Sequence, residues 1–213
     1  MVFWRGEPRD TPPGSKFGTL RGGLGYQQRL DFVRLTAESS YDRFANLSGD
    51  LGTRLRALQV RSDVRPVEYL GFEPKPGEPG RHFASLEEWC DHMYLPHLAG
   101  WAYSAGLKYK LLCGSMVIAV RPPADCRSKY RCADSEEFWY RAARDAGLWV
   151  DVDLGEPMRI ERFWEAILAA WDVAEGVGGR ARNWANRYLG SEGLDCYWYG
   201  VVERYVGLLK RGR

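Results

Sequence analysis

One stretch, "HLAGWAYSAGLKYKLLCGSMVIAV" (residues 97–120), carries the residue types and spacings that most suggest chemistry. Gly100 would let the backbone come close to a ligand. Ser104 offers a hydroxyl, and Lys108 follows one helical turn later, so both lie on one face of a helix. Together with the free N–H groups of a first helical turn, these groups suit a phosphate. From the spacing alone, however, the favoured interpretation is a helix cap followed by a solvated lysine.

The elements around this stretch predict where it would lie. "YLPHLAG" indicates a strand with an edge position or an irregular end because of Pro96. A helix is predicted at about 103–112. "SMVIAV", residues 115–120, is a continuous apolar run typical of a strand that is covered on both faces. In an open parallel sheet, ligands bind beyond the carboxyl ends of the strands. The Ser104 and Lys108 segment begins at such a place.

The rest of the chain alternates strand and helix patterns in the same way. Strands are predicted at "MVFWRG", at "RALQVRS" around Leu58 and Val60, and at "LWVDVD". Helices are predicted at "GYQQRLDFVRLTAES", at "SLEEWCDHM" with a capping box from Ser85 to Glu88, at "EEFWYRAARDAG" ending at Gly147, at "MRIERFWEAILAAWDVA", at "GRARNWANRYLG" and at "LDCYWYGVVERYVGLLKR". This order predicts βαβ units and hence an α/β fold with a parallel sheet and flanking helices.

We expect one Rossmann-like domain over residues 1–213. Its parts are the first βα units at 1–70, central units at 81–155 and C-terminal helices at 156–213. The segment "GFEPKPGEPG" at 71–80 is a Pro/Gly loop between them. The first residues, "MVFWRGEPRD", lack the apolar segment of a signal peptide and resemble the interior of a domain. We therefore expect a fragment or an incomplete gene product.

The composition excludes some classes of protein. Thirty basic and 28 acidic side chains leave a net charge of +2, which disfavours a nucleic-acid-binding protein. No apolar run approaches the roughly 20 residues of a membrane helix. The five cysteines are an odd number at irregular spacing, so they do not form a disulfide framework. Cys126 and Cys132 lie in one polar loop. They could form a disulfide in an oxidising compartment or remain free thiols.

Three other patterns are weighed and ranked down. Asp151 and Asp153 alternate on a strand and could share a cation, but their apolar strand context favours a structural role. Cys90, His92 and His97 lack the paired spacings of zinc sites. "GVGGR" at 176–180 does not follow a strand, so it fails the context of a dinucleotide-binding loop. Tyr197 and Trp198 could stack on a sugar, but a contribution to the hydrophobic core is the preferred interpretation. We therefore expect no metal and no cofactor.

The order of several motifs resembles a known family. These are "FWRG", a helix with "QRL", "GWAYS…LKYKLLCGSMV", "EFWYRAARDAGLWVDVD" and "LDCYWYGVVERYVGLL". The chain is similar, over nearly its whole length, to the Rumi-type protein O-glucosyltransferases and fungal capsule-associated xylosyltransferases, glycosyltransferase family 90 with its CAP-like domain. The resemblance implies a GT-B fold of two Rossmann-like halves, a UDP-sugar donor, an inverting mechanism and no required metal. It also implies the lumen of the endoplasmic reticulum or Golgi.

The resemblance implies a set of donor-side residues: Arg5, Gly6, Arg29, Gly100, Ser104, Lys108, Gly114 and Ser115, with Cys113 before the last two. Glu137 is a weaker candidate for holding ribose hydroxyls. Two departures stand out. Glu7 replaces the serine that usually follows Arg-Gly, and residues 105–107 lack the basic residue that many members carry before the helix lysine.

The family's acceptor half and general base would precede the Arg-Gly motif, so no catalytic base is assigned here. We therefore expect the C-terminal donor-binding half of a transferase that moves glucose or xylose from a UDP-sugar to a protein or glycan hydroxyl. The alternative is a non-catalytic nucleotide- or glycan-binding module, which a missing base would produce. Donor turnover distinguishes the two, and steep salt dependence of binding would revive the nucleic-acid interpretation.

Overall fold

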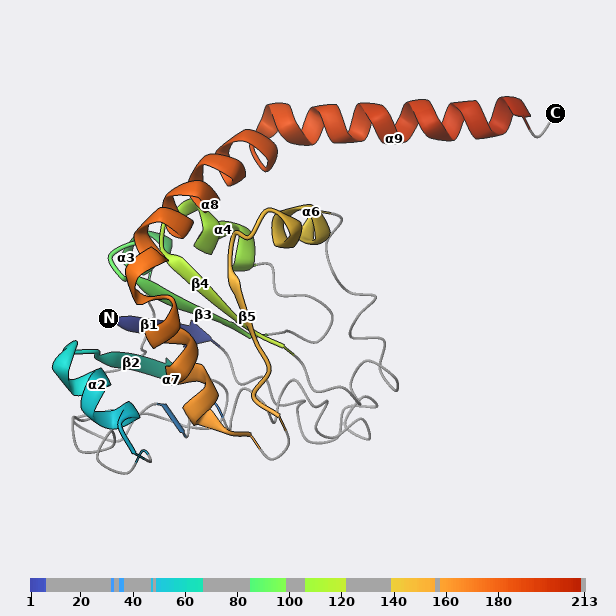
Figure 1. Cartoon of the computed structure of the whole chain (residues 1–213). Helices are drawn as coiled ribbons and strands as arrows, with labels where there is room; N and C mark the ends of the chain where they lie inside the picture. The colour runs from blue at the N-terminus through green and yellow to red at the C-terminus, as the bar shows by residue number, and fades with distance from the viewer. Residues whose placement is uncertain are drawn as a thin grey trace, which may run out of the picture.

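The core of the fold is a five-stranded parallel β-sheet, seen in a computed structural model of the chain (Figure 1). The structure describes residues 1–6, 32, 35–36, 47, 49–66, 85–98, 106–121, 139–155 and 158–211. The strands are β1 (Val2–Gly6), β2 (Ser62–Pro66), β3 (Tyr94–Leu98), β4 (Met116–Val120) and β5 (Val150–Val152). All five residues of β3 and of β4 are buried, as expected for strands that are covered on both faces.

The strand order is β2-β1-β3-β4-β5, and every pair is parallel. This is the order of a doubly wound sheet, whose connections reverse direction between β1 and β3. The predicted Rossmann-like α/β fold is therefore confirmed.

Helices cover both faces of the sheet (Figure 1). On one face, α2 (Leu51–Ala57) and α7 (Ile160–Ala169) pack with the side chains of Val64, Ile118 and Phe163 in the larger apolar cluster. On the other face, α4 (Gly106–Leu112) and α6 (Tyr140–Asp145) pack in a second cluster with the alternate residues of β4. The second cluster fixes α4, which carries Lys108, against β4 through Leu107 and Leu111.

Helix α8 (Ala174–Tyr188) passes from one face of the sheet to the other. Its early residues Ala174 and Val177 belong to the first cluster, and its later residues Ala181 and Ala185 belong to the second. Between them, Gly178 lies so close to the turn before β4 that an added Cβ would overlap the carbonyl oxygen of Gly114. The glycine-rich stretch 176–180 is therefore part of a helix, and one of its glycines is required by close packing.

Most predicted elements are confirmed. The strand patterns at "MVFWRG", "YLPHLAG", "SMVIAV" and "LWVDVD" correspond to β1, β3, β4 and β5. Short helix α3 (Leu86–Trp89) begins with the predicted capping box, in which Ser85 and Glu88 bond each other's backbone N–H groups. Helix α6 ends before Gly147, whose φ of 63° is the left-handed conformation of a helix terminus. The final helix is α9 (Ser191–Arg211).

Three predictions of secondary structure were wrong. "RALQVRS" is not a strand: Leu51, Leu55 and Leu58 have helical spacing, and they pack as the inner face of α2 and its end. The strand follows at Ser62–Pro66. The pattern at 158–174 is not one helix, because α7 ends at Ala169 and a 3₁₀ turn, η3 (Trp171–Val173), leads into α8. Finally, β3 is an internal strand despite Pro96.

Helix α9 differs from every other element because it leaves the domain (Figure 1). None of its residues whose burial the structure describes is buried. No helix in the described part of the chain is long and apolar enough to cross a membrane.

Candidate functional site

The carboxyl ends of β1 and β3 form the edge of the sheet where a doubly wound fold binds its ligands. Arg5 and Gly6 are the last two residues of β1, and Leu98 is the last residue of β3. The chain connections reverse between these two strands, and doubly wound folds bind their ligands at such a switch point. The Arg-Gly pair singled out in the sequence ends one of these strands, and the stretch after Leu98 follows the other.

Pro96 interrupts the hydrogen-bond ladder between β1 and β3. At the start of the two strands Val2 pairs with Tyr94, and the amide of Tyr94 donates to the carbonyl of Met1 at 3.3 Å. Two residues later, Pro96 has no N–H to donate to the same side. The proline that predicted an edge position or an irregular strand end therefore lies inside the sheet, where it leaves a ladder hydrogen bond toward β1 unmade.

Lys110 provides the hydrogen-bond donor for the backbone carbonyl group of Pro96. Its side chain is buried, and its Nζ donates to that oxygen at 2.5 Å. The same ammonium lies over the ring of Trp89, 5.3 Å from the centroid, in cation–π geometry. Sequence analysis missed this residue, although Leu107, Lys110 and Leu111 share the inward i, i+3, i+4 face of α4. Lys110 is thus a structural group that holds α4 against β3.

Lys108 has a different environment on the same helix. It is the third residue of α4, and this helix follows the carboxyl end of β3. Its side chain is half-buried, with Nζ 5.0 Å from the centroid of the Tyr109 ring. It forms no ion pair with any residue in the part of the chain that the structure describes. Lys108 therefore places a positive charge at the ligand-binding edge, and no carboxylate in the described part of the chain neutralises it.

The structure brings only part of the predicted donor set to this edge. Arg5 and Gly6 end β1, and Lys108 lies in the first turn of α4, so all three positions are at this edge. For Arg5 and Gly6 this statement applies to the backbone only. Four of the predicted residues lie outside the described ranges: Arg29, Gly100, Ser104 and Glu137. Glu7 and the pair Cys126 and Cys132 also lie outside them. Their predicted roles stay predictions.

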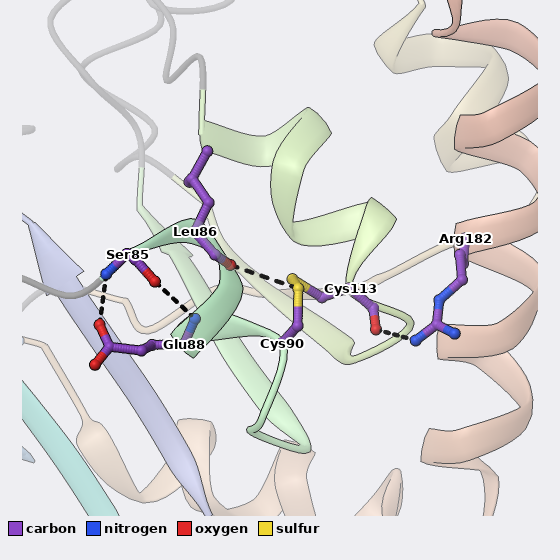
Figure 2. The surroundings of a disulfide bond; sticks show 6 residues. All are labelled: Ser85, Leu86, Glu88, Cys90, Cys113 and Arg182. Atoms are coloured by element: carbon purple, nitrogen blue, oxygen red, sulfur yellow. Dashed lines mark hydrogen bonds between the residues drawn. A yellow bond between two sulfur atoms is a disulfide. The ribbon is translucent and has the colours of Figure 1, made fainter.

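Gly114 and Ser115 lie at the opposite edge of the sheet, in the turn that enters β4. Gly114 has a φ of 74°, which favours glycine, and the guanidinium of Arg182 occupies the space beside its Cα. The same guanidinium donates to the carbonyl of Cys113 (Figure 2). Ser115 is buried. Lys108 and these two residues stand at opposite ends of α4, so the structure does not bring them together.

A disulfide joins Cys90 to Cys113 beside this turn (Figure 2). The two cysteines are 23 positions apart and follow α3 and α4, so the bond closes the α3-β3-α4 segment. Sequence analysis named both cysteines without pairing them. The signal was available, because helices that lead into neighbouring parallel strands end at the same edge of the sheet. Because it is bonded to Cys113, Cys90 is not a free thiolate in this structure.

Asp151 and Asp153 have structural partners. The carboxylate of Asp151 accepts from Arg121 at 3.1 Å and from the indole of Trp149 at 3.2 Å, and Arg144 lies 3.5 Å away. Asp153 follows β5 and accepts from the amide of Gly155 in a turn. The preferred interpretation of this motif as structural therefore agrees with its contacts.

The clearest perturbation of acidity lies away from the ligand-binding edge. Burial, with a smaller contribution from the Asp172 carboxylate, raises the pKa of Tyr94 to about 12. Its hydroxyl has no hydrogen-bond partner in the described part of the structure, and its ring packs 6.0 Å from that of Trp171. Shifted pKa values often mark functional groups, but here the cause is enclosure at the start of β3.

Comparison with known proteins identifies relatives over most of the sequence. Residues 20–212 match the family model described as glycosyl transferase family 90. Human protein O-glucosyltransferase 1 is 23% identical over 98% of this chain and 53% of its own length. The O-glucosyltransferase rumi of Drosophila melanogaster is 26% identical over 62% of this chain and 30% of its own length. A rumi homolog from Aedes aegypti is 26% identical over 59% and 29%.

The chain therefore spans about half the length of the human relative and less of the insect ones. The region that matches the family model, residues 20–212, includes Lys108, the disulfide and most of the length of α9, whereas β1 precedes it. The chain belongs to glycosyl transferase family 90.

Proposed function

We propose that this chain is the donor-binding half of a glycosyltransferase that uses a UDP-sugar. The observation that carries the proposal is the position of Lys108 in the first turn of α4, the helix that follows β3 at the switch point between β1 and β3. Membership of the family supplies the reaction class, since its relatives bear the name O-glucosyltransferase. The sugar would be glucose or xylose, and the acceptor a hydroxyl on a protein or glycan.

In this proposal the diphosphate of the donor lies across the crevice. Lys108 and Arg5 would neutralise it, and the residues predicted from the sequence at positions 29, 100, 104 and 137 would complete the donor contacts. Gly114 and Ser115 would act indirectly, because their packing holds the far end of α4. No metal is required for neutralisation when fixed cations take that role.

The transfer would be an inverting displacement at the anomeric carbon. The acceptor oxygen forms a bond to that carbon while the bond to the β-phosphate oxygen breaks, and UDP leaves with the electron pair. Cations fixed at the diphosphate stabilise the charge that builds on it. A general base must take the proton of the acceptor hydroxyl, and no described residue of this chain is assigned to that role.

The compartment follows from the disulfide. Structural disulfides form and persist in oxidising compartments, and Cys90–Cys113 closes a packed edge of the domain. We therefore propose the lumen of the endoplasmic reticulum or Golgi as the place of action.

Calorimetric titration with UDP, without added metal, tests the donor site. The purified chain should bind UDP, and Lys108→Ala should weaken binding about 10- to 100-fold, the loss expected for one charge-assisted hydrogen bond. Arg141→Ala is the matched control, because Arg141 is an exposed cation on α6 with its own ion pair to Asp145.

Three outcomes separate the possibilities. If UDP binds but a UDP-sugar is never turned over with peptide or glycan acceptors, the chain is a binding module. If the folded chain does not bind UDP, the donor site is refuted. If binding requires Mn²⁺, the metal-independent part of the proposal fails.

A further inference from the structure

The side chain of Lys108 has a single interaction in the part of the chain that the structure describes. Its ammonium nitrogen lies 5.0 Å from the centroid of the Tyr109 ring, in cation–π geometry. Among the described residues it forms no hydrogen bond, ion pair or other ring contact. The ring of Tyr109 is therefore the one described group that determines where this positive charge lies.

The inner side of α4 gives that ring a fixed position. Leu107 and Leu111 are buried in the second apolar cluster, and the ammonium of Lys110 donates to the carbonyl of Pro96 in β3. These contacts fix the rotation of the helix, so that Tyr109 lies on its outer side and is 39% exposed. An aromatic side chain has only two rotatable bonds. The ring is thus a rigid surface beside a flexible lysine.

The contact between Lys108 and Tyr109 restricts the lysine. Side chains at positions i and i+1 of a helix do not face each other, so the long, flexible stem of Lys108 must bend around the helix to reach the ring. A lysine without such a contact samples many rotamers, and their loss on binding opposes affinity. A ring that already restricts the stem reduces this loss, which is the general effect of preorganisation.

The contact also leaves the ammonium able to bind an anion. A lysine ammonium has three N–H donors, and the face of one ring lies on one side of it only. Phosphate oxygens can therefore approach the same nitrogen from the side away from the ring.

We propose that Tyr109 is a positioning residue, which holds the ammonium of Lys108 at the carboxyl edge of the sheet for the diphosphate of the donor. This inference rests on the proposed function, because it concerns the same cation. It adds the residue that determines where that cation lies.

Calorimetric titration with UDP tests this role. Tyr109→Leu keeps an apolar side chain but removes the π face, and UDP affinity should fall about two- to fivefold, the weight of one exposed cation–π contact. Tyr109→Phe keeps the ring and should bind UDP as the parent chain does. Circular dichroism checks folding, and Tyr109→Gln replaces Tyr109→Leu if that variant is unfolded.

The matched control is Tyr188→Leu. Tyr188 is an exposed tyrosine on α8 that also has a neighbouring cation over its ring, since Arg187 lies 5.4 Å from the ring centroid. The control therefore removes the same kind of pair from a helix to which we assign no donor contact. It should leave UDP affinity unchanged.

A double-mutant cycle separates positioning from direct contact with the ligand. In the Lys108→Ala background, Tyr109→Leu should cause no further loss of UDP affinity, because the ring then has no ammonium to hold. The same loss in both backgrounds would mean that the ring stacks on the donor itself, and it would overturn the proposal.

Nuclear magnetic resonance of the chain labelled at lysine tests the contact without any ligand. Protons above an aromatic ring are shifted upfield by its ring current, so the ε-methylene resonance of Lys108 should be shifted upfield. The shift should disappear in Tyr109→Leu and persist in Tyr109→Phe. Lys108→Ala assigns the resonance, which is needed because Lys110 lies over the ring of Trp89. An unshifted Lys108 resonance in the parent chain would overturn the proposal.

The titrations distinguish failure of this inference from failure of the proposed function. A folded parent chain that binds no UDP refutes the donor site and, with it, the role of Tyr109. If the parent chain binds UDP and Tyr109→Leu binds it equally well, only the positioning role is refuted. Tighter binding by Tyr109→Leu also refutes that role, since the ring would then withhold the lysine from the ligand.

Discussion

The two edges of the same sheet differ in what holds them. At the amino edge, the turn from Cys113 to Ser115 is closed by α8, by the guanidinium of Arg182 and by a disulfide. At the carboxyl edge, Pro96 interrupts the ladder between β1 and β3, and Lys108 is half-buried on the helix that follows β3. One sequence block, residues 106–115, joins the two edges. The difference teaches that a contiguous motif can combine a ligand-binding segment with the structural anchor of the same helix.

The comparison predicts that changes at the amino edge reduce stability without reducing UDP affinity. The largest effect is expected for Gly178→Ala, whose Cβ would overlap backbone atoms of Gly114. We expect a loss of about 3 kcal/mol in the free energy of unfolding. Gly179→Ala is the matched control, since its Cβ would meet nothing within 4 Å, and alanine should stabilise the helix by about 0.5–1 kcal/mol. Urea unfolding measures both, and equal stability of the two variants would refute the close packing.

Removal of the disulfide is the next largest change. The double variant Cys90→Ala with Cys113→Ala should lose about 2–4 kcal/mol, because the unfolded chain is no longer constrained. Thermal unfolding with and without reductant measures the loss, and reductant should not affect the double variant further. Cys196→Ser is the control, since Cys196 is a free, exposed cysteine. A parent protein that is insensitive to reductant would show that the bond does not stabilise this edge.

Arg182→Met tests whether a change at the amino edge leaves the carboxyl edge unaffected. Loss of the charged donor to Cys113 should cost about 1–2 kcal/mol of stability. UDP affinity measured below the unfolding transition should stay within about twofold, unlike that of Lys108→Ala. A variant that is stable but binds UDP weakly would mean that the two edges are coupled through α4.

Tyr94→Phe should have the smallest effect at neutral pH, less than about 1 kcal/mol, because the buried hydroxyl that it removes has no partner in the described structure. In alkali the two proteins should differ. The folded-state pKa of Tyr94 is raised to about 12 from an ordinary value of 10.0. The contribution of Tyr94 to the free energy of unfolding is therefore fully present below pH 10. It is lost as the pH rises toward 12, since the hydroxyl ionises first in the unfolded chain. The free energy of unfolding, measured as a function of pH, should fall less steeply for Tyr94→Phe than for the parent protein.

Much of the fold could be predicted because local signals agreed with tertiary structure. The apolar run in β4, the capping box at Ser85 and the glycine after α6 each determine an element locally. The failures arise where distant residues decide. Pro96 is compatible with an internal strand because only its missing N–H interrupts the ladder toward β1, and because Lys110 donates to its carbonyl oxygen. The Cys90–Cys113 pairing likewise depends on the positions of two helix ends in space.

The candidate site was predictable in part for the same reason. Lys108 could be identified from its place after a strand, which is a property of the sequence order. The packing of Gly114 against Gly178 and Arg182 could not, because it depends on where α8 crosses the sheet. Sequence proximity placed Lys108 and Gly114 in one motif, whereas α4 carries them to opposite edges.

The position of β1 has a consequence for how the chain acquires its structure. This strand comes first in the sequence, yet it lies inside the sheet, where Val2 pairs with both Ser62 and Tyr94. These pairings are non-local, and folds of high contact order form slowly because long loops must close before contacts are gained. During synthesis, β1 must therefore wait first for β2 and then for β3 before both of its neighbours in the sheet are present.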